Sequence, residues 1–209
     1  MNYLFVILTF AISFCVAWFI IPRILMISLR KKLFDLPNER KIHKRAIPRL
    51  GGVAFFPTIL LSCCITLAFY YLSGYEIQSA ICILPELLLF ISGLVFLYLT
   101  GIADDLLGVR YRQKFIIQII CASFFPISGL WINDLYGLFG INEISMWIGM
   151  PLTILITVFI TNAINLIDGI DGLASGLSSV SLLIFGFLFM REELWIFSML
   201  SFSTVGVLI

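Results

Sequence analysis

The chain has 209 residues, of which 61% are hydrophobic and only 12% are charged, and its formal net charge is +1. A soluble domain of this size carries about 25% charged residues, so this composition excludes a soluble globular protein. The total charge indicates no partner by itself, and we expect no nucleic acid among the partners. The cysteines lie in apolar runs without C-x-x-C spacing, which favours buried apolar side chains over disulfides or zinc: Cys15, Cys63, Cys64, Cys82 and Cys121.

Several apolar segments are long enough to cross a membrane, which takes about 20 helical residues for about 30 Å of hydrocarbon. Helices are expected because the backbone polar groups must be satisfied within each segment. We therefore predict an all-α polytopic membrane protein that forms one transmembrane catalytic domain over residues 1–209. The last segment is short, and we expect the domain to be incomplete at its C-terminal end. About seven spans are predicted: 3–29, 50–72, 80–103, 115–132, 146–166, 173–190 and 194–209.

The basic residues predict the orientation of these spans. Of the 13 Lys and Arg residues, all except Arg191 lie in or beside the segments that follow the first and third spans. Basic residues mark the cytoplasmic face, so the N-terminus is expected outside. The first, third and fifth spans then all end at the cytoplasmic face. Three polar clusters that are far apart in sequence are expected to meet there.

The first cluster is the basic segment 35–52, which contains His43, Lys44 and Arg49. Part of its charge is explained by topology and by anionic lipid headgroups. Pro48 and Arg49, followed by Gly51 and Gly52, are more specific, because they place a cation at the start of a helix, where backbone N–H groups also favour anions. These cations are candidates for binding phosphate.

The second cluster is the pair Asp104–Asp105 at the end of the third apolar run. Two adjacent carboxylates disfavour joint ionisation unless a cation neutralises them. The candidates are a divalent metal ion or nearby Lys and Arg side chains. Mg²⁺ prefers oxygen ligands and often binds through one or two carboxylates together with substrate phosphates. The alternative is a helix-end pair that faces water.

The third cluster has an amide or a carboxylate at every third position: Asn162, Asn165, Asp168 and Asp171. A mid-membrane Asp costs roughly 2.5 kcal/mol or more, so polar groups beside apolar runs are first interpreted as a functional site. A glycine follows each Asp and allows the backbone to approach a ligand closely. This arrangement suits a metal–diphosphate site better than a proton relay. A polar loop between two helices is the alternative.

Together, these motifs resemble the polyprenyl-phosphate N-acetylhexosamine-1-phosphate transferases of glycosyltransferase family 4. The resemblance rests on three motifs in order: Arg40 to His43 with Pro48 to Gly52, then Gly101 to Asp105, then Asn162 to Gly172. It implies that a UDP-N-acetylhexosamine, most often UDP-N-acetylglucosamine, gives its sugar-1-phosphate to undecaprenyl phosphate and that UMP leaves. Such enzymes start the synthesis of O-antigen, teichoic acid and capsule at the cytoplasmic face of the bacterial inner membrane.

The resemblance also implies roles for individual residues. Asp104, Asp105 and Asp168 are the expected catalytic residues, and Asp168 and Asp105 are the expected ligands of Mg²⁺, with Mn²⁺ as the alternative metal. The expected substrate-binding residues are Lys44, Arg49, His43, Lys114, Asn165 and Asp171. The lipid phosphate is already largely dianionic at neutral pH, which favours direct attack on the sugar-bearing phosphorus over a covalent aspartyl intermediate. A homodimer is an open alternative for the oligomeric state.

Two departures from the family pattern matter. Arg49–Leu50–Gly51–Gly52 and Gly108 differ from the muramoyl-pentapeptide branch, which argues against a peptidoglycan precursor as the substrate. Full members have ten or eleven spans and a later loop rich in His and Arg, whereas this chain has one histidine. An inactive truncated member is therefore one alternative.

Two other functions are rivals. A CDP-alcohol phosphotransferase would have Asp-Gly followed by Ala-Arg, but Leu173 and Ala174 follow Asp171–Gly172. A polytopic transporter would carry its polar residues at mid-membrane on broken helices, whereas here they are expected at one face.

Overall fold

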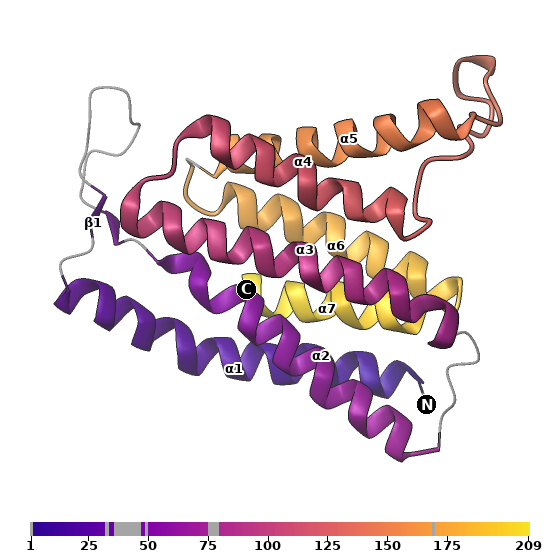
Figure 1. The fold of residues 1–209 in the computed structure, drawn as a ribbon. Helices are drawn as coiled ribbons and strands as arrows, with labels where there is room; N and C mark the ends of the chain where they lie inside the picture. Colours follow the sequence, from indigo (N-terminus) through magenta and orange to yellow (C-terminus); the bar gives the residue numbers. More distant parts are fainter. Residues whose placement is uncertain (1, 32–33, 36–46, 49, 75–79, 169) are drawn as a thin grey trace. The chain divides into compact units, whose positions relative to one another are not determined.

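The computed structural model describes residues 2–31, 34–35, 47–48, 50–74, 80–168 and 170–209 (Figure 1). Among these residues the only strands are β1 and β2, which pair antiparallel with Phe34 opposite Pro48. The prediction of an all-α polytopic membrane protein is confirmed. The elements are α1 Asn2–Arg30, β1 Phe34–Asp35, β2 Ile47–Pro48, the 3₁₀ turn η1 Gly51–Ala54, α2 Phe55–Leu72, α3 Ala80–Leu107, α4 Tyr111–Ile127, the 3₁₀ turn η2 Leu138–Gly140, α5 Met146–Ile167, α6 Leu173–Arg191 and α7 Trp195–Leu208.

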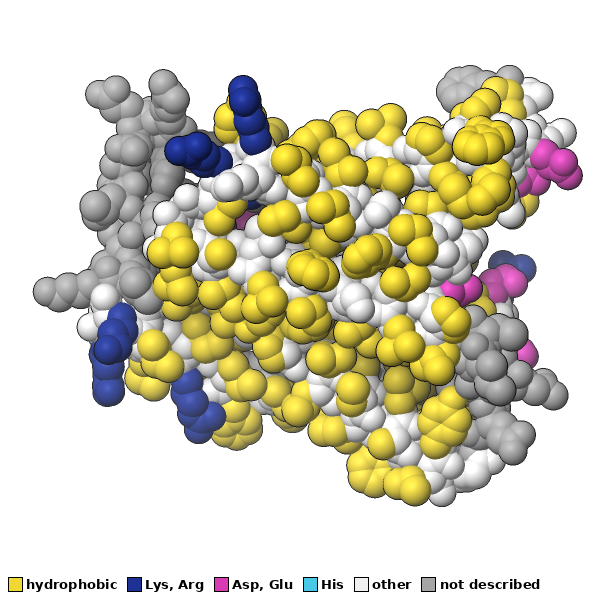
Figure 2. Space-filling view, in the orientation of Figure 1, with side chains coloured by type: hydrophobic (Ala, Val, Ile, Leu, Met, Phe, Trp, Pro, Cys, Tyr) yellow, Lys and Arg dark blue, Asp and Glu magenta, His cyan; other side chains and the backbone are white. Residues whose placement is uncertain are grey.

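Five stretches of described helix are long and apolar enough to cross a membrane: 2–30, 51–72, 84–107, 146–167 and 173–191. The apolar helix α7 is shorter, with 14 residues, and the 17-residue α4 carries Arg112 and Lys114 near its start. Large apolar side chains such as Trp18 and Phe159, each 70% exposed, lie on the outside of the helices, and hydrophobic side chains cover much of the surface in Figure 2. Such a surface is suited to lipid.

The helices α3 and α4 differ from the predicted spans 80–103 and 115–132. Helix α3 continues to Leu107 and stops at Gly108, whose φ of 72° takes the chain out of the helix. Helix α4 starts at Tyr111 and ends at Ile127, because Gly129 adopts a φ of 98° and Leu130 N donates to Phe125 O at 3.0 Å. The backbone conformation at the two glycines sets these ends, and the hydropathy of the neighbouring residues does not reveal it.

The described chain divides into two compact units. Unit 1 comprises Met1–Glu76 and Ile167–Ile209, and unit 2 comprises Ile77–Leu166. The single domain predicted for residues 1–209 stays a prediction, and each unit is described by itself.

Unit 1 is built around α7, which packs against α1, α2 and α6. Its core contains small hydroxyl side chains as well as apolar ones. Ser13 of α1 donates to Ser203 O at 2.5 Å, and the hydroxyls of Ser203 and Ser62 of α2 are hydrogen-bonded at 2.7 Å. All three residues are fully buried. Small residues let membrane helices approach closely, and their hydroxyls link the three helices.

Unit 2 contains α3, α4 and α5. The most extensive contact between its helices is that of α3 with α4. At this contact a Cβ on Gly93 would lie 3.4 Å from the Phe124 ring, so the two helices are closely packed here. The C-terminal ends of α3 and α5 and the N-terminal end of α4 lie at the same end of this unit (Figure 1).

The packing of unit 1 predicts that Gly206→Ala is destabilising. A Cβ at this position would lie 2.8 Å from Phe10 O, so α1 and α7 must move apart. We expect a loss of about 1–3 kcal/mol in the free energy of unfolding, as for other overpacked sites. The control is Gly176→Ala in α6, where a Cβ meets nothing within 4 Å. Thermal unfolding in detergent measures both variants, and equal midpoints would contradict the close α1–α7 contact.

Candidate functional site

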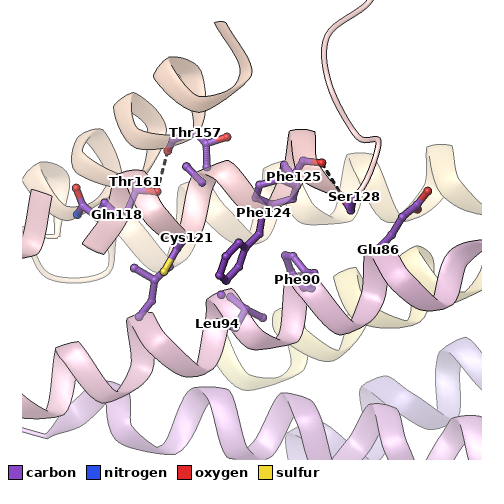
Figure 3. A pocket seen from close by; sticks show the side chains of 13 residues that line it. Glu86, Phe90, Leu94, Gln118, Cys121, Phe124, Phe125, Ser128, Thr157 and Thr161 are labelled. Atoms are coloured by element: carbon purple, nitrogen blue, oxygen red, sulfur yellow. Dashed lines mark hydrogen bonds between the residues drawn. The ribbon is translucent and has the colours of Figure 1, made fainter. Parts of the chain in front are cut away.

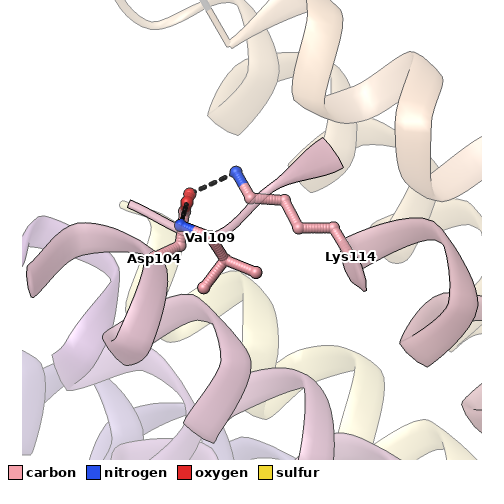
Figure 4. A network of polar contacts seen from close by, with 3 residues as sticks. All are labelled: Asp104, Val109 and Lys114. Atoms are coloured by element: carbon pink, nitrogen blue, oxygen red, sulfur yellow. Dashed lines mark hydrogen bonds and ion pairs between the residues drawn. The ribbon is translucent and has the colours of Figure 1, made fainter. Parts of the chain in front are cut away.

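The Asp104–Asp105 pair lies in the last turn of α3, just before Gly108 turns the chain back toward α4. The Asp104 carboxylate is bonded on both sides (Figure 4). Its Oδ1 accepts a hydrogen bond from the Val109 backbone N at 2.9 Å, and its Oδ2 forms an ion pair with Lys114 Nζ. Asp104 therefore fastens the connection between α3 and α4 and holds the Lys114 ammonium at the end of unit 2.

Two kinds of cation were predicted to neutralise the acidic pair, a nearby Lys or Arg and a divalent metal ion. The structure provides the first for Asp104, and the metal ion stays a prediction. The neutralising group at its Oδ2 is a lysine of the next helix. The side chains of Asp104 and Lys114 are 32% and 36% exposed, and an ion pair this open contributes little to stability. Its consequence is mainly geometric, because it fixes the direction of a long cationic side chain. The ammonium has three donors, so Lys114 keeps donors for a second anion.

Asp105 is the next residue on α3 and is partly exposed. Successive residues of an α-helix point about 100° apart, so its carboxylate faces a different direction from that of Asp104. The two acids of the pair therefore have different surroundings, which allows them different roles.

The Asn/Asp stretch spans the end of α5 and the turn into α6. Helix α5 ends at Ile167, Asp168 follows it directly, and Gly172, with a φ of 74°, precedes the first residue of α6. Asp168 and Asp171 are exposed in this turn, and Asn165 is exposed in the last turn of α5. The carboxylates of this motif are thus placed at a helix end, where water and a soluble substrate can reach them.

Asn162 has a different environment from the rest of its motif. It is half-buried, and its Nδ2 donates to Gln118 Oε1 of α4 and to Val158 O, both at 2.8 Å. Asn162 therefore links two helices of unit 2.

Of the predicted site residues, the structure brings Asp104 and Lys114 together. Asp168 and Asp171 belong to unit 1, and their convergence with the acids of α3 stays a prediction. Within the part of the chain that the structure describes, no three His, Cys, Asp or Glu residues form a group that could hold a metal ion. The assignment of Asp105 and Asp168 as metal ligands stays a prediction. The predicted phosphate-binding residues His43, Lys44 and Arg49 lie outside the described residues.

The sequence argument missed Gln118. It is the one strongly polar side chain in the apolar run 115–122, and it lies four residues after Lys114, so both are on one face of α4. A lone amide in a membrane helix needs a partner, and this signal could have identified it.

Comparison with known proteins tests the resemblance. The sequence model of Glycosyl transferase family 4 matches residues 87–209. The chain belongs to glycosyl transferase family 4. The match includes the Asp104–Asp105 pair and the Asn/Asp stretch, and it begins after the basic segment 35–52.

Three relatives illustrate the range of this family. The chain is 32% identical over 178 residues to a probable undecaprenyl-phosphate N-acetylglucosaminyl 1-phosphate transferase of Bacillus subtilis (strain 168). The aligned region covers 85% of the chain and 46% of the relative. It is 28% identical over 204 residues to an undecaprenyl-phosphate alpha-N-acetylglucosaminyl 1-phosphate transferase of Yersinia pestis, with 93% and 51% covered. It is also 28% identical over 196 residues to a phospho-N-acetylmuramoyl-pentapeptide-transferase of Staphylococcus carnosus (strain TM300), with 87% and 58% covered. This family 4 chain thus spans about half the length of the curated relatives it matches.

The ion pair predicts energetic coupling between Asp104 and Lys114. Asp104→Asn and Lys114→Met each remove the pair, so their effects on the free energy of unfolding should not add. A double-mutant cycle should give a coupling of about 0.2–1 kcal/mol, the range for exposed ion pairs. Arg112→Met is the control, because its guanidinium contacts the neighbouring Tyr111 of its own helix. Strict additivity of Asp104→Asn with Lys114→Met would show that the two side chains are not paired in the membrane.

Proposed function

We propose that the protein is a phosphosugar transferase that moves N-acetylglucosamine-1-phosphate from UDP-N-acetylglucosamine to undecaprenyl phosphate and releases UMP. The reaction is the first membrane step of a cell-envelope polysaccharide. The observation that carries the proposal is the family match over residues 87–209, because it contains both acid-bearing helix ends. Their position favours a soluble diphosphate substrate over the rival transporter, whose polar residues would interrupt helices at mid-membrane.

The site is proposed to face the cytoplasm at the inner membrane. The Lys and Arg residues beside the first and third spans support this orientation. The two substrates then meet at the leaflet surface: the nucleotide sugar comes from water, and the polyprenyl phosphate comes from the lipid.

The Gly108 turn argues against a peptidoglycan precursor as the substrate. Within the family that this chain resembles, the muramoyl-pentapeptide branch has a lysine where this chain has Gly108. Here the residue is a glycine with a φ of 72°, and this conformation is disfavoured for any residue with a Cβ. The conformation of this turn therefore depends on glycine at position 108. The cation near the turn is Lys114, which is paired with Asp104.

The donor atoms fit Mg²⁺. Asp105 is partly exposed and Asp168 is exposed, so both can offer hard carboxylate oxygens to a cation that keeps several waters. Asp105 and Asp168 would hold the ion, with Mn²⁺ as the alternative. When bound, it would neutralise the diphosphate of the nucleotide sugar.

The remaining roles are those that the resemblance to the family implies. Lys114, directed by Asp104, offers its ammonium to the phosphate of the lipid, and the exposed Asn165 and Asp171 hold the nucleotide sugar. Lys44 and Arg49 supply further positive charge, and His43 pairs with a phosphate.

The lipid phosphate is largely dianionic at neutral pH and needs alignment more than deprotonation. One of its oxygens attacks the sugar-bearing phosphorus directly. The bond from this phosphorus to the bridging oxygen breaks, and UMP leaves with that oxygen. Asp104 is placed to orient Lys114 during this step, and Asp105 is the second acid of the pair.

We expect membranes that contain the protein to release UMP from UDP-N-acetylglucosamine only when both Mg²⁺ and polyprenyl phosphate are present. Asp168→Asn should lower the rate by at least about 10²-fold, because it removes a preorganised charge from the diphosphate site. The control is Asp134→Asn in the loop between α4 and α5, since an asparagine can still accept the Tyr136 N–H bond. UMP release can be followed by chromatography of the nucleotides. Normal turnover in Asp168→Asn would contradict the proposed role of Asp168. If the parent protein itself releases no UMP, the inactive truncated alternative is favoured.

A further inference from the structure

Helix α5 is attached to the rest of unit 2 near both of its ends. Near its start, Gly149 lies so close to Trp131 and Ile132 O that a Cβ would collide with both, and Thr153 Oγ1 accepts a hydrogen bond from Ile132 N at 2.9 Å. Near its other end, Asn162 Nδ2 donates to Gln118 Oε1 of α4 at 2.8 Å. The second attachment includes this hydrogen bond between two side chains.

A cavity of about 180 Å³ lies between these two attachments (Figure 3). Side chains from α3, α4 and α5 line it, among them Phe90, Leu94, Cys121, Phe124, Thr157 and Thr161. Gln118 lies at one end of this lining beside Thr161, and Glu86 and Ser128 lie at the other. Over this stretch α5 borders a cavity, and the bond between Gln118 and Asn162 joins α5 to α4 beside it.

This bond lies one helical turn inside the candidate site. Gln118 follows Lys114 by four residues on α4, and Asn165 follows Asn162 by three on α5, so each hydrogen-bonded residue shares a helix face with a site residue. The start of α4 and the end of α5 lie at the same end of unit 2 (Figure 1). A rotation of α5 about its axis would therefore move Asn165 relative to Lys114.

We propose that Gln118 is a positioning residue of the phosphosugar site, and that its amide oxygen sets the rotation of the end of α5 by accepting the hydrogen bond from Asn162. The inference rests on the proposed function and adds to it a residue inside the helix bundle. Gln118 acts through Asn162, so it is expected to affect the alignment of the substrates rather than to react with them.

Positioning can be separated from simple stabilisation. Asn162 also donates to Val158 O within its own helix, and this bond stays when Gln118 is replaced. Gln118→Leu should therefore remain folded with nearly unchanged thermal stability, while the end of α5 turns. Gln118→Glu keeps an acceptor oxygen at the same distance along the side chain and should restore the alignment. Asn162→Ala removes the same bond from the other side.

The experiment compares these three variants with Ser123→Ala, whose hydroxyl bonds only to Ile120 O of α4. The first measurement is kcat and KM for UDP-N-acetylglucosamine in membranes. The second is the distance distribution between spin labels at Arg112 and Leu166, both exposed, in a background without native cysteines. The second measurement needs no activity.

In Gln118→Leu and Asn162→Ala we expect kcat to fall about tenfold to a hundredfold, the scale of a small misplacement of reacting groups. The label distances should broaden in both. Gln118→Glu and Ser123→Ala should stay within about twofold of the parent and keep its distance distribution.

The inference is overturned if Gln118→Leu matches Ser123→Ala in kcat, whether or not the label distances change. It is also overturned if Gln118→Glu is as impaired as Gln118→Leu, because the acceptor oxygen would then not be the important group. If the parent protein transfers no phosphosugar, the proposed function fails instead. The label distances then decide alone: broadening in Gln118→Leu supports the control of α5 by Gln118, and an unchanged distribution refutes it.

Discussion

In hydrocarbon no water is present to satisfy a polar group, so each one must find a partner within the protein or lie at the end of a helix. In unit 1 the hydroxyls of Ser13, Ser62 and Ser203 bond across three helices. In unit 2 the amides of Gln118 and Asn162 bond across two. Charged groups lie at the ends of helices instead: Asp104 is in the last turn of α3, and Asp168 directly follows α5. The same constraint that organises the packing thus places these acids at the ends of helices.

The connection between α3 and α4 shows how a local backbone feature serves this arrangement. Gly108 ends α3 with a positive φ, and the following residues bring Val109 N and Lys114 Nζ to the two oxygens of Asp104. An acid and a base ten residues apart thereby act as one group. Under the proposed function, we interpret it as a fixed cation that can meet a substrate phosphate.

Much of this fold could be predicted from hydropathy, because each long apolar run became a helix. The ends of α3 and α4 could not be predicted from hydropathy, because they depend on the positive φ angles of Gly108 and Gly129. The buried residues of α7 could not be predicted either. In lipid both the core and the surroundings are apolar, and buried serines such as Ser198 and Ser203 carry no hydrophobic signal. The acids of the candidate site were proposed from their types and spacing, and their roles stay predictions. The partner of Lys114 and the bond between Gln118 and Asn162 required the three-dimensional arrangement of the helices.

The central claim is that the helix ends bearing Asp105 and Asp168 open to the same side of the membrane, and cysteine accessibility tests it most directly. Single cysteines at Leu107 and Ile170, both exposed, would be labelled in sealed inverted and right-side-out vesicles by a reagent that cannot cross the bilayer. A cysteine at Tyr136, 89% exposed in the loop between α4 and α5, marks the opposite side. Leu107 and Ile170 should both react only in inverted vesicles and Tyr136 only in right-side-out ones. Reaction of Leu107 and Ile170 from opposite sides would contradict a shared site.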